Sequence, residues 1–224
     1  MNAIPGVIDP TALGTASDDK LEVIVNALEK DGWCVVPGFL ESPLWRAIAA
    51  EARELYDEGE FRQAGVGRHH TFMIRPEIRN DRVLWLDPAS PTRLQAEYLE
   101  RMEWLRQRIN RELQLGLFGF ESHYAIYPAG SFYRRHLDQF RGAAHRTVSC
   151  ILYLNDDWRP EDGGALRIYL PLSDNAAAPV ETHFDLLPEG GSLVVFLSAG
   201  FEHEVLPATR ERMSITGWFF RNGR

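Results

Sequence analysis

The chain has 224 residues, 45% of them apolar and 25% charged, which is the composition of an ordinary globular protein with one domain and a substantial core. Its net charge of −8 gives no support for binding to nucleic acids or anionic membranes, because both need a basic surface. The sequence has no long apolar run and no basic segment followed by an apolar one, so we expect neither a transmembrane helix nor a signal peptide.

The first elements predict helices that brace a sheet. A helix begins near Ser17 or Asp18, and its buried stripe has the i, i+3, i+4, i+7 spacing: Leu21, Ile24, Val25 and Leu28. A strand at 33–36 follows. Ser42-Pro43 then predicts the cap of a second helix that runs to about Gly59, with a core face of Leu44, Ile48, Ala52 and Leu55.

The region from Arg62 to Arg82 has no sustained periodicity, and its glycines favour a mobile loop. His69 and His70 are adjacent, so they would point to opposite sides of a strand and are not expected to chelate one metal. Ser90-Pro91 predicts the cap of a long third helix that stops at Gly116 and buries Leu94, Tyr98, Met102, Leu105, Ile109 and Leu113.

The two cysteines, Cys34 and Cys150, both lie in apolar stretches. Buried free thiols are the default for such residues in a reducing cytoplasm, with a disulfide as the alternative. We therefore expect a cytoplasmic location.

The remainder of the chain, from Leu117 onward, reads as strands separated by turns: 118–127, 132–138, 147–154, 165–170, 181–187, 192–197, 203–207 and 213–220. About eight short strands at this spacing favour a jelly roll or a barrel. Helices first and strands later give an α+β plan. We expect a single domain, 1–224, in which 1–116 is mainly helical support and loop and 117–224 is the jelly-roll core.

A candidate metal site lies on these strands. His136 and Asp138 are separated by one residue, so on an extended strand they project from the same face. His203, at the start of a later strand, completes a set of two histidines and one carboxylate, which is typical of non-haem Fe(II) oxygenases. The alternative is that the histidines are surface or hydrogen-bonded residues, since a His-x-Asp triplet also occurs by chance.

An arginine near such a metal has a definite use. A 2-oxo acid that fills the open coordination positions leaves a second carboxylate deep in the pocket, and a guanidinium matches that carboxylate with two hydrogen bonds. Arg212 and Thr216 share one face of the last strand, so they are candidates for this role. The alternative is that Arg212 is a solvated member of the charged cluster Arg210-Glu211-Arg212.

Several spaced motifs carry a resemblance to a known family: Tyr127-Pro128, Tyr133-Arg-Arg-His136-Leu-Asp138, Arg146-Thr-Val-Ser-Cys-Ile-Leu-Tyr153-Leu-Asn155, Asp162-Gly-Gly-Ala-Leu-Arg-Ile-Tyr169, His203-Glu-Val-Leu-Pro with Arg212, and Ile215-Thr-Gly-Trp218. In these residues the chain resembles the prolyl-hydroxylase branch of the 2-oxoglutarate and Fe(II)-dependent dioxygenases. It is similar to the hypoxia-factor prolyl hydroxylases and more so to their bacterial relatives. The resemblance is dense in the C-terminal half.

The resemblance implies a double-stranded β-helix fold, Fe(II) bound by His136, Asp138 and His203, 2-oxoglutarate and O2 as co-substrates, and ascorbate as a candidate reductant. It implies that Tyr153 bonds the far carboxylate of 2-oxoglutarate beside Arg212. Tyr127 and Ile151 would belong to the walls of that site. Because a carboxylate ligand is present at Asp138, the resemblance favours hydroxylation over halogenation.

The resemblance also implies a proline-bearing protein or peptide as substrate, with elongation factor Tu as the best single candidate, and we expect the enzyme to be a monomer. A finger-like loop at 62–82 would fold over the peptide. The residues that match the prolyl pocket and the returning strand of this loop are Tyr133, Arg146, Trp218, Trp85 and Arg79.

Other functions stay open at this point. The same oxygenase chemistry could act on a small molecule or on another side chain. A cupin-like module could use the His and Asp residues to hold a structural metal without catalysis, and a zinc hydrolase is a third possibility. For any single aromatic residue named above, core packing is an equal alternative. His123, which shares a strand face with Tyr127, is expected to be structural.

Overall fold

The computed structural model of the chain describes residues 8, 17–67, 72–139, 146–170 and 182–221. The strands among these residues are β1 Trp33–Val36, β2 Arg62–Gln63, β3 Arg82–Trp85, β4 Leu117–Tyr127, β5 Tyr133–His136, β6 Arg146–Tyr153, β7 Leu166–Tyr169, β8 His183–Leu186, β9 Leu193–Leu197, β10 His203–Val205 and β11 Arg212–Arg221.

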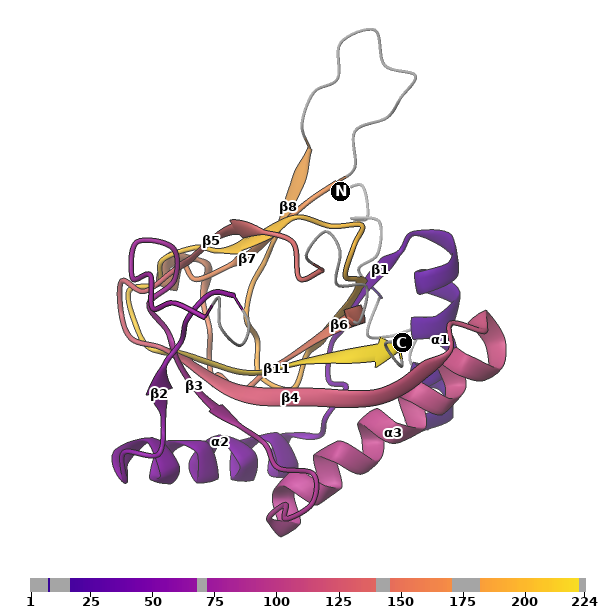
Figure 1. Ribbon diagram of the computed structural model, residues 1–224, viewed down its shortest axis with the longest axis horizontal. Helices are drawn as coiled ribbons and strands as arrows, with labels where there is room; N and C mark the ends of the chain where they lie inside the picture. Colours follow the sequence, from indigo (N-terminus) through magenta and orange to yellow (C-terminus); the bar gives the residue numbers. More distant parts are fainter. Residues whose placement is uncertain (1–7, 9–16, 68–71, 140–145, 171–181, 222–224) are drawn as a thin grey trace, which may run out of the picture.

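The strands form two antiparallel sheets that lie face to face (Figure 1). A seven-stranded sheet has the order β1-β9-β6-β11-β4-β3-β2, and a four-stranded sheet has the order β5-β10-β7-β8. Strands distant in sequence therefore lie side by side, which gives the predicted jelly roll.

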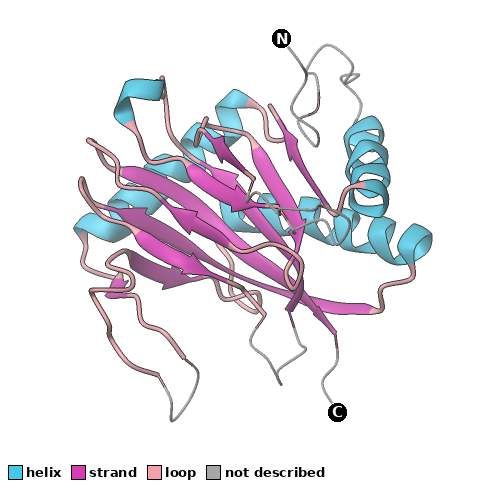
Figure 2. Ribbon diagram, turned by 90° about the horizontal axis from the view of Figure 1, so that it is seen from above, coloured by secondary structure: helices cyan, strands magenta, loops and turns pink. Residues whose placement is uncertain are grey.

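Three helices cover the outer face of the larger sheet: α1 Ser17–Lys30, α2 Ser42–Asp57 and α3 Arg93–Leu113 (Figures 1 and 2). The predicted stripe of α1 is buried in full, and that of α3 is buried at Tyr98, Met102, Leu105 and Ile109. Apolar side chains of the sheet meet these stripes in one core cluster. Among the described residues, no helix combines the length and apolar character that a membrane crossing needs.

The predicted caps of two helices were wrong. The N-cap of α2 is Glu41, and Ser42 is already helical. The N-cap of α3 is Thr92, because its hydroxyl accepts a bond from the Gln95 backbone while the Gln95 side chain bonds back to Thr92, a reciprocal pair that Ser90 does not form. At the other end, Gln114 adopts the left-handed conformation before Gly116 is reached.

The two faces of β11 differ in chemistry, as its alternation predicts. Met213, Ile215 and Phe219 pack toward the helices. Arg212, Thr216 and Trp218 instead line a cavity between the two sheets. The sheet is thus a wall with an apolar core on one side and, on the other, a cavity lined by both polar and apolar side chains.

The region predicted as a loop from Arg62 to Arg82 contains short regular pairing, so that prediction was wrong in part. β2 pairs with β3, and Val66 exchanges two backbone hydrogen bonds with Met73, each 2.9 Å long. A two-residue strand is too short to show a period in sequence, which explains the miss. His69 and His70 lie outside the described residues.

Candidate active site

A cavity of about 380 Å³ lies between the two sheets and is lined by residues of both. His136 ends β5 and His203 begins β10, and these two residues are direct partners in the antiparallel pairing of the smaller sheet. Asp138 lies two residues beyond His136. The pairing therefore brings His203 to the neighbouring ligands His136 and Asp138, which are more than sixty residues earlier in the sequence.

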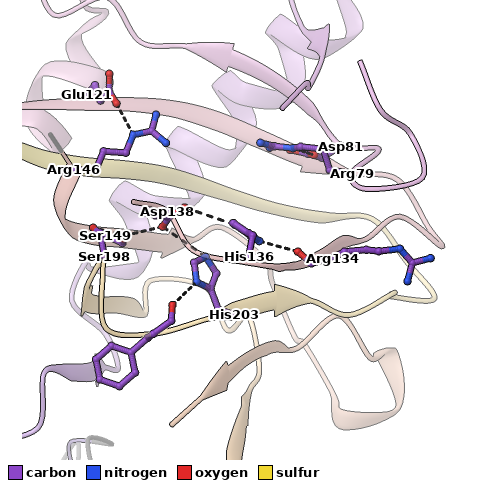
Figure 3. A network of polar contacts seen from close by, with 11 residues as sticks. Arg79, Asp81, Glu121, Arg134, His136, Asp138, Arg146, Ser149, Ser198 and His203 are labelled. Carbon is purple, nitrogen blue, oxygen red and sulfur yellow. Dashed lines mark hydrogen bonds and ion pairs between the residues drawn. The ribbon is translucent and has the colours of Figure 1, made fainter. Parts of the chain in front are cut away.

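The three ligands converge on one point (Figure 3). The Nε2 atom of His136 is 3.6 Å from Oδ1 of Asp138, and Nε2 of His203 is 3.6 Å from Oδ2 of the same carboxylate. The ligand atoms all lie within 4.8 Å of one another. Two imidazoles and one carboxylate at this spacing suit Fe(II) and leave coordination positions open for other ligands.

The histidine rings are held in the orientation that a metal needs. Nδ1 of His136 bonds the carbonyl of Arg134 at 2.8 Å, and Nδ1 of His203 bonds the carbonyl of Phe201 at 3.1 Å (Figure 3). A carbonyl only accepts, so each Nδ1 carries the proton and each Nε2 presents its lone pair to the metal.

The charge states of the ligands also suit a metal. Burial lowers the pKa of His203 to about 4, and the neighbouring His136 acts in the same direction, so the ring is neutral at pH 7. Burial opposes ionisation of Asp138, yet His203, His136 and the Ser149 hydroxyl together hold the pKa of its carboxyl well below the usual range. A neutral imidazole and an ionised carboxylate are the binding forms.

The prediction of a single strand over 132–138 was wrong, because Asp138 lies outside the observed strand. β5 ends at His136, its last pairing with β10, and Asp138 lies in the bend that follows. The alternation of a strand therefore does not place this carboxylate. The carboxylate still points toward the two histidines, because Ser149 on the opposite sheet donates a hydrogen bond that holds it there.

Arg212 lies in the cavity wall with 1% of its surface exposed. Its Nε donates to the carbonyl of Gly164 at 2.9 Å, while its Nη2 is buried without a partner. The hydroxyl of Tyr153 is also buried without a partner, and the Tyr153 ring centre is 5.1 Å from the guanidinium carbon. No carboxylate of the described residues forms an ion pair with Arg212.

These unpaired groups fit the far carboxylate of 2-oxoglutarate. A buried guanidinium needs an anion, and two unpartnered donors side by side are what a carboxylate accepts. Burial raises the pKa of Tyr153 to about 12, so its hydroxyl keeps its proton and can donate. The alternative of a solvated Arg212 is excluded by its burial.

Gly164, whose carbonyl accepts from Arg212, packs closely against Ala208 and Trp158. Its φ is +67°, and a Cβ there would lie 2.8 Å from the Cβ of Ala208 and 3.0 Å from Trp158. Only glycine adopts this conformation without strain and lets the backbone approach so closely. The Asp162-Gly163-Gly164 motif thus places the carbonyl that orients the guanidinium.

The predicted walls of the oxo-acid site also line the cavity. Tyr127 is paired with Arg212 across β4 and β11, and Ile151 is paired with Thr216 across β6 and β11. All four side chains therefore face the cavity, at two levels that are separated by the level of Ser214. Their contacts with 2-oxoglutarate stay a prediction.

All five residues predicted to bind substrate line the same cavity: Tyr133, Arg146, Trp218, Trp85 and Arg79. The guanidinium of Arg146 lies 3.4 Å from the centre of the Trp218 ring, and its Nε donates to Glu121 at 2.7 Å. Trp85 remains 51% exposed and lies 6.2 Å from Trp218, between ring centres. These residues form an aromatic surface in reach of the metal ligands.

Three residues of the site escaped the sequence prediction. Asp81 is fully buried and holds Arg79 with two hydrogen bonds, a pairing that their i, i+2 spacing could have indicated. Ser149 shares its strand face with Ile151, so its position was readable from the alternation of β6. Ser198 lies in a turn, and no local pattern points to it. His123 is buried as expected, yet it also lines the cavity.

The chain is similar to oxygenases of known family. The family model described as 2OG-Fe(II) oxygenase superfamily matches residues 122–220, which include the three ligands and Arg212. A crystal structure of a Pseudomonas putida prolyl-4-hydroxylase is 47% identical in sequence, with a TM-score of 0.78, and the match covers 91% of this chain and all of that one.

Two animal proteins extend the similarity. A Trichoplax adhaerens prolyl hydroxylase in complex with a hypoxia-inducible factor peptide fragment is 27% identical, with a TM-score of 0.78, over 91% of this chain and 90% of that one. Human Egl nine homolog 1 is 33% identical in an alignment of 207 residues that covers 89% of this chain and 46% of the relative. The chain spans about half the length of the mammalian Egl nine homolog 1 proteins that it matches. The predicted resemblance and the jelly-roll fold are confirmed.

Proposed function

Because the chain belongs to the 2OG-Fe(II) oxygenase superfamily, we propose that it hydroxylates a proline residue carried by a protein or peptide. It is a 2-oxoglutarate-dependent dioxygenase that uses Fe(II) and O2. Bound Fe(II) and 2-oxoglutarate supply the oxidative chemistry, in which 2-oxoglutarate becomes succinate and CO2 and one oxygen atom passes to the substrate.

One observation carries the proposal: a single cavity contains the His136, Asp138 and His203 ligands together with the unpaired, buried Arg212. His136 and His203 would bind the metal through Nε2, and Asp138 would bind it through its ionised carboxylate. Arg212 and Tyr153 would hold the far carboxylate of 2-oxoglutarate. The apolar wall side chains of the cavity exclude water from this region.

The entrance of the cavity supports a peptide as substrate. Phe72, Met73 and Ile74 are more than half exposed, although they are large and apolar, and Phe72 lines the cavity. Exposed apolar side chains beside a cavity favour a docked partner over a small polar metabolite. Trp85 and Trp218 offer flat apolar surfaces suited to a proline ring.

Elongation factor Tu is the first candidate substrate. This candidate rests on the resemblance to bacterial prolyl hydroxylases, while the 47% identity to a Pseudomonas putida prolyl-4-hydroxylase supports only the prolyl chemistry. Intact-mass analysis of elongation factor Tu, incubated with enzyme, Fe(II) and 2-oxoglutarate, should show a gain of one oxygen atom. The gain should vanish when the modified proline is replaced by alanine and when the enzyme carries His136→Ala. If the enzyme modifies a proline-bearing peptide but leaves elongation factor Tu unmodified, the factor is rejected as substrate and the prolyl hydroxylase activity stands.

A further inference from the structure

We infer that the hydroxyl groups of Ser149 and Ser198 position Asp138 as a one-oxygen metal ligand and thereby strengthen metal binding. The inference rests on the part of the proposed function that assigns Fe(II) to His136, Asp138 and His203. It does not depend on which substrate is hydroxylated.

The three side chains form a continuous hydrogen-bonded chain (Figure 3). The Oγ atom of Ser149 is 2.7 Å from Oδ2 of Asp138 and 2.9 Å from Oγ of Ser198. Both serines are fully buried, and Asp138 is 6% exposed. Water therefore does not compete for these bonds, and each one is worth more than a surface contact.

The direction of the chain follows from the chemistry of the groups. A metal-bound carboxylate is ionised and only accepts hydrogen bonds, so Ser149 donates to Asp138. The single proton of Ser149 is then used, so the bond between the serines must be donated by Ser198. Each hydroxyl thus has one fixed role. Loss of the Ser149 hydroxyl leaves Asp138 without a donor, and loss of the Ser198 hydroxyl leaves the Ser149 hydroxyl without the bond that orients it.

The serines stand on a rigid frame, whereas Asp138 does not. Ser149 is in the interior of β6, with Phe196 of β9 on one side and Trp218 of β11 on the other. Ser198 follows β9 directly, and its backbone N–H donates to the carbonyl of Thr147 at 3.0 Å. Asp138 lies beyond the end of β5 in the smaller sheet. The Ser149 hydroxyl therefore ties the ligand to the larger sheet across the cavity.

The bond also separates the two carboxylate oxygens by role. Oδ2 accepts from Ser149, which lowers its ability to donate electrons to a metal. Each oxygen lies 3.6 Å from one imidazole Nε2, Oδ1 from that of His136 and Oδ2 from that of His203, but Oδ1 accepts no hydrogen bond from the described residues. The metal would then take Oδ1 alone, which keeps the remaining positions open for 2-oxoglutarate and O2.

Metal affinity tests the inference without any turnover. Mn(II) is titrated into the metal-free protein, and free Mn(II) is followed by electron paramagnetic resonance. Removing a hydrogen-bond partner of a ligand typically weakens metal binding by about 10-fold to 100-fold. We expect a weakening of about 10-fold or more for Ser149→Ala, a smaller one for Ser198→Ala, and affinity close to the wild type for Ser149→Thr, which restores the hydroxyl.

Ser122→Ala is the matched control. Ser122 is also a buried serine in the interior of a strand, but its hydroxyl has no partner, and it shares its strand face with Tyr124 of the helix-side core. The Co(II) absorption spectrum adds a readout of coordination, because a change from one-oxygen to two-oxygen ligation changes the geometry of the metal. We expect an altered spectrum in Ser149→Ala and an unaltered one in Ser122→Ala.

Thermal melting of each metal-free variant reports whether it folds. If Ser149→Ala does not fold, Ser198→Ala decides, because it keeps the donor to Asp138 and removes only the bond that orients that donor; a weakening of more than twofold is then expected. Affinities within twofold of the wild type for every folded alanine variant of the two serines, with an unaltered Co(II) spectrum, would overturn the inference. Absence of proline hydroxylation with normal Mn(II) binding would instead reject the proposed substrate alone.

Discussion

The phenol ring of Tyr133 lies flat on the imidazole of His136, with ring centres 3.6 Å apart and an interplanar angle of 15°. The guanidinium of Arg79 lies 4.3 Å from the centre of the same phenol ring, and Asp81 holds that guanidinium with two hydrogen bonds. A metal ligand is thus stacked on a side chain that is itself fixed by a buried ion pair. The stack therefore connects Arg79, in the segment before β3, to the metal ligand His136 through Tyr133.

Tyr133→Ala should weaken metal binding by about twofold to tenfold, because a stacked aromatic pair contributes about 0.5–1.5 kcal/mol. Tyr133→Phe keeps the stack and should change the affinity by less than about twofold. Mn(II) titration of both variants measures the difference. Equal weakening in both would show that the hydroxyl, and not the stack, supports His136.

Arg212→Ala should raise the KM for 2-oxoglutarate by about 10-fold to 100-fold, because a hydrogen bond to a charged group contributes about 1.5–3 kcal/mol. Tyr153→Phe removes a single donor and should raise it less. Succinate release at varied 2-oxoglutarate concentration gives the KM, and Mn(II) titration serves as the control, since neither residue is a metal ligand. An unchanged KM in Arg212→Ala would remove this residue from the oxo-acid site.

Gly164→Ala should also raise the KM for 2-oxoglutarate, because the added Cβ would push against Ala208 and Trp158 and displace the carbonyl that orients Arg212. Gly116→Ala is the matched control: Gly116 has a similar positive φ of +66°, and nothing lies within 4 Å of an added Cβ. Both variants should lose about 1 kcal/mol of stability from backbone strain, measured by urea unfolding. A normal KM in Gly164→Ala would contradict the assigned role.

The buried, neutral imidazole of His123 should lower the free energy of unfolding as the pH falls into the mildly acidic range. Burial lowers the pKa of its imidazole to about 4, and the nearby Arg79 acts in the same direction. The unfolded chain takes up this proton near pH 6.5 and the folded chain only near pH 4, so stability falls as the pH drops from 6.5 to 4. The contribution is up to about 3 kcal/mol.

The His123→Gln variant isolates this effect. Urea unfolding of metal-free wild type and variant should give a difference in unfolding free energy that shrinks or reverses in favour of the variant between pH 6.5 and pH 4. The His203 ring has a similarly lowered pKa but is present in both proteins, so its contribution cancels. A difference that is independent of pH would show that His123 is protonated in the folded protein.

Much of the fold and site could be predicted because local alternation carries it. The stripe of α1 and the two faces of β11 follow from periods of 3.6 and 2 residues. The strand start at His203 and the His136-x-Asp138 spacing named three candidate ligands, although the strand assumed to carry Asp138 ends at His136. Arg212 was named for its position on the same strand face as Thr216. Its burial excludes the solvated alternative, and its role toward 2-oxoglutarate stays a prediction.

The parts that could not be predicted depend on contacts between distant segments. Trp45 of α2 is buried against the backbone of Gly190 and Gly191, which helical periodicity cannot reveal. Asp138 lies beyond the end of its strand, where alternation no longer fixes a direction. The link from Ser198 to Ser149 joins a turn to a strand that precedes it by nearly fifty residues.

The most direct test of the central claim measures succinate formed from 2-oxoglutarate by purified enzyme in the presence of Fe(II) and O2, with a proline-bearing peptide. The account predicts one succinate for each oxygen atom gained by the peptide. It also predicts loss of both products in His136→Ala and on removal of Fe(II) with a chelator. Enzyme that binds Fe(II) at an intact triad yet leaves 2-oxoglutarate unconsumed would contradict it.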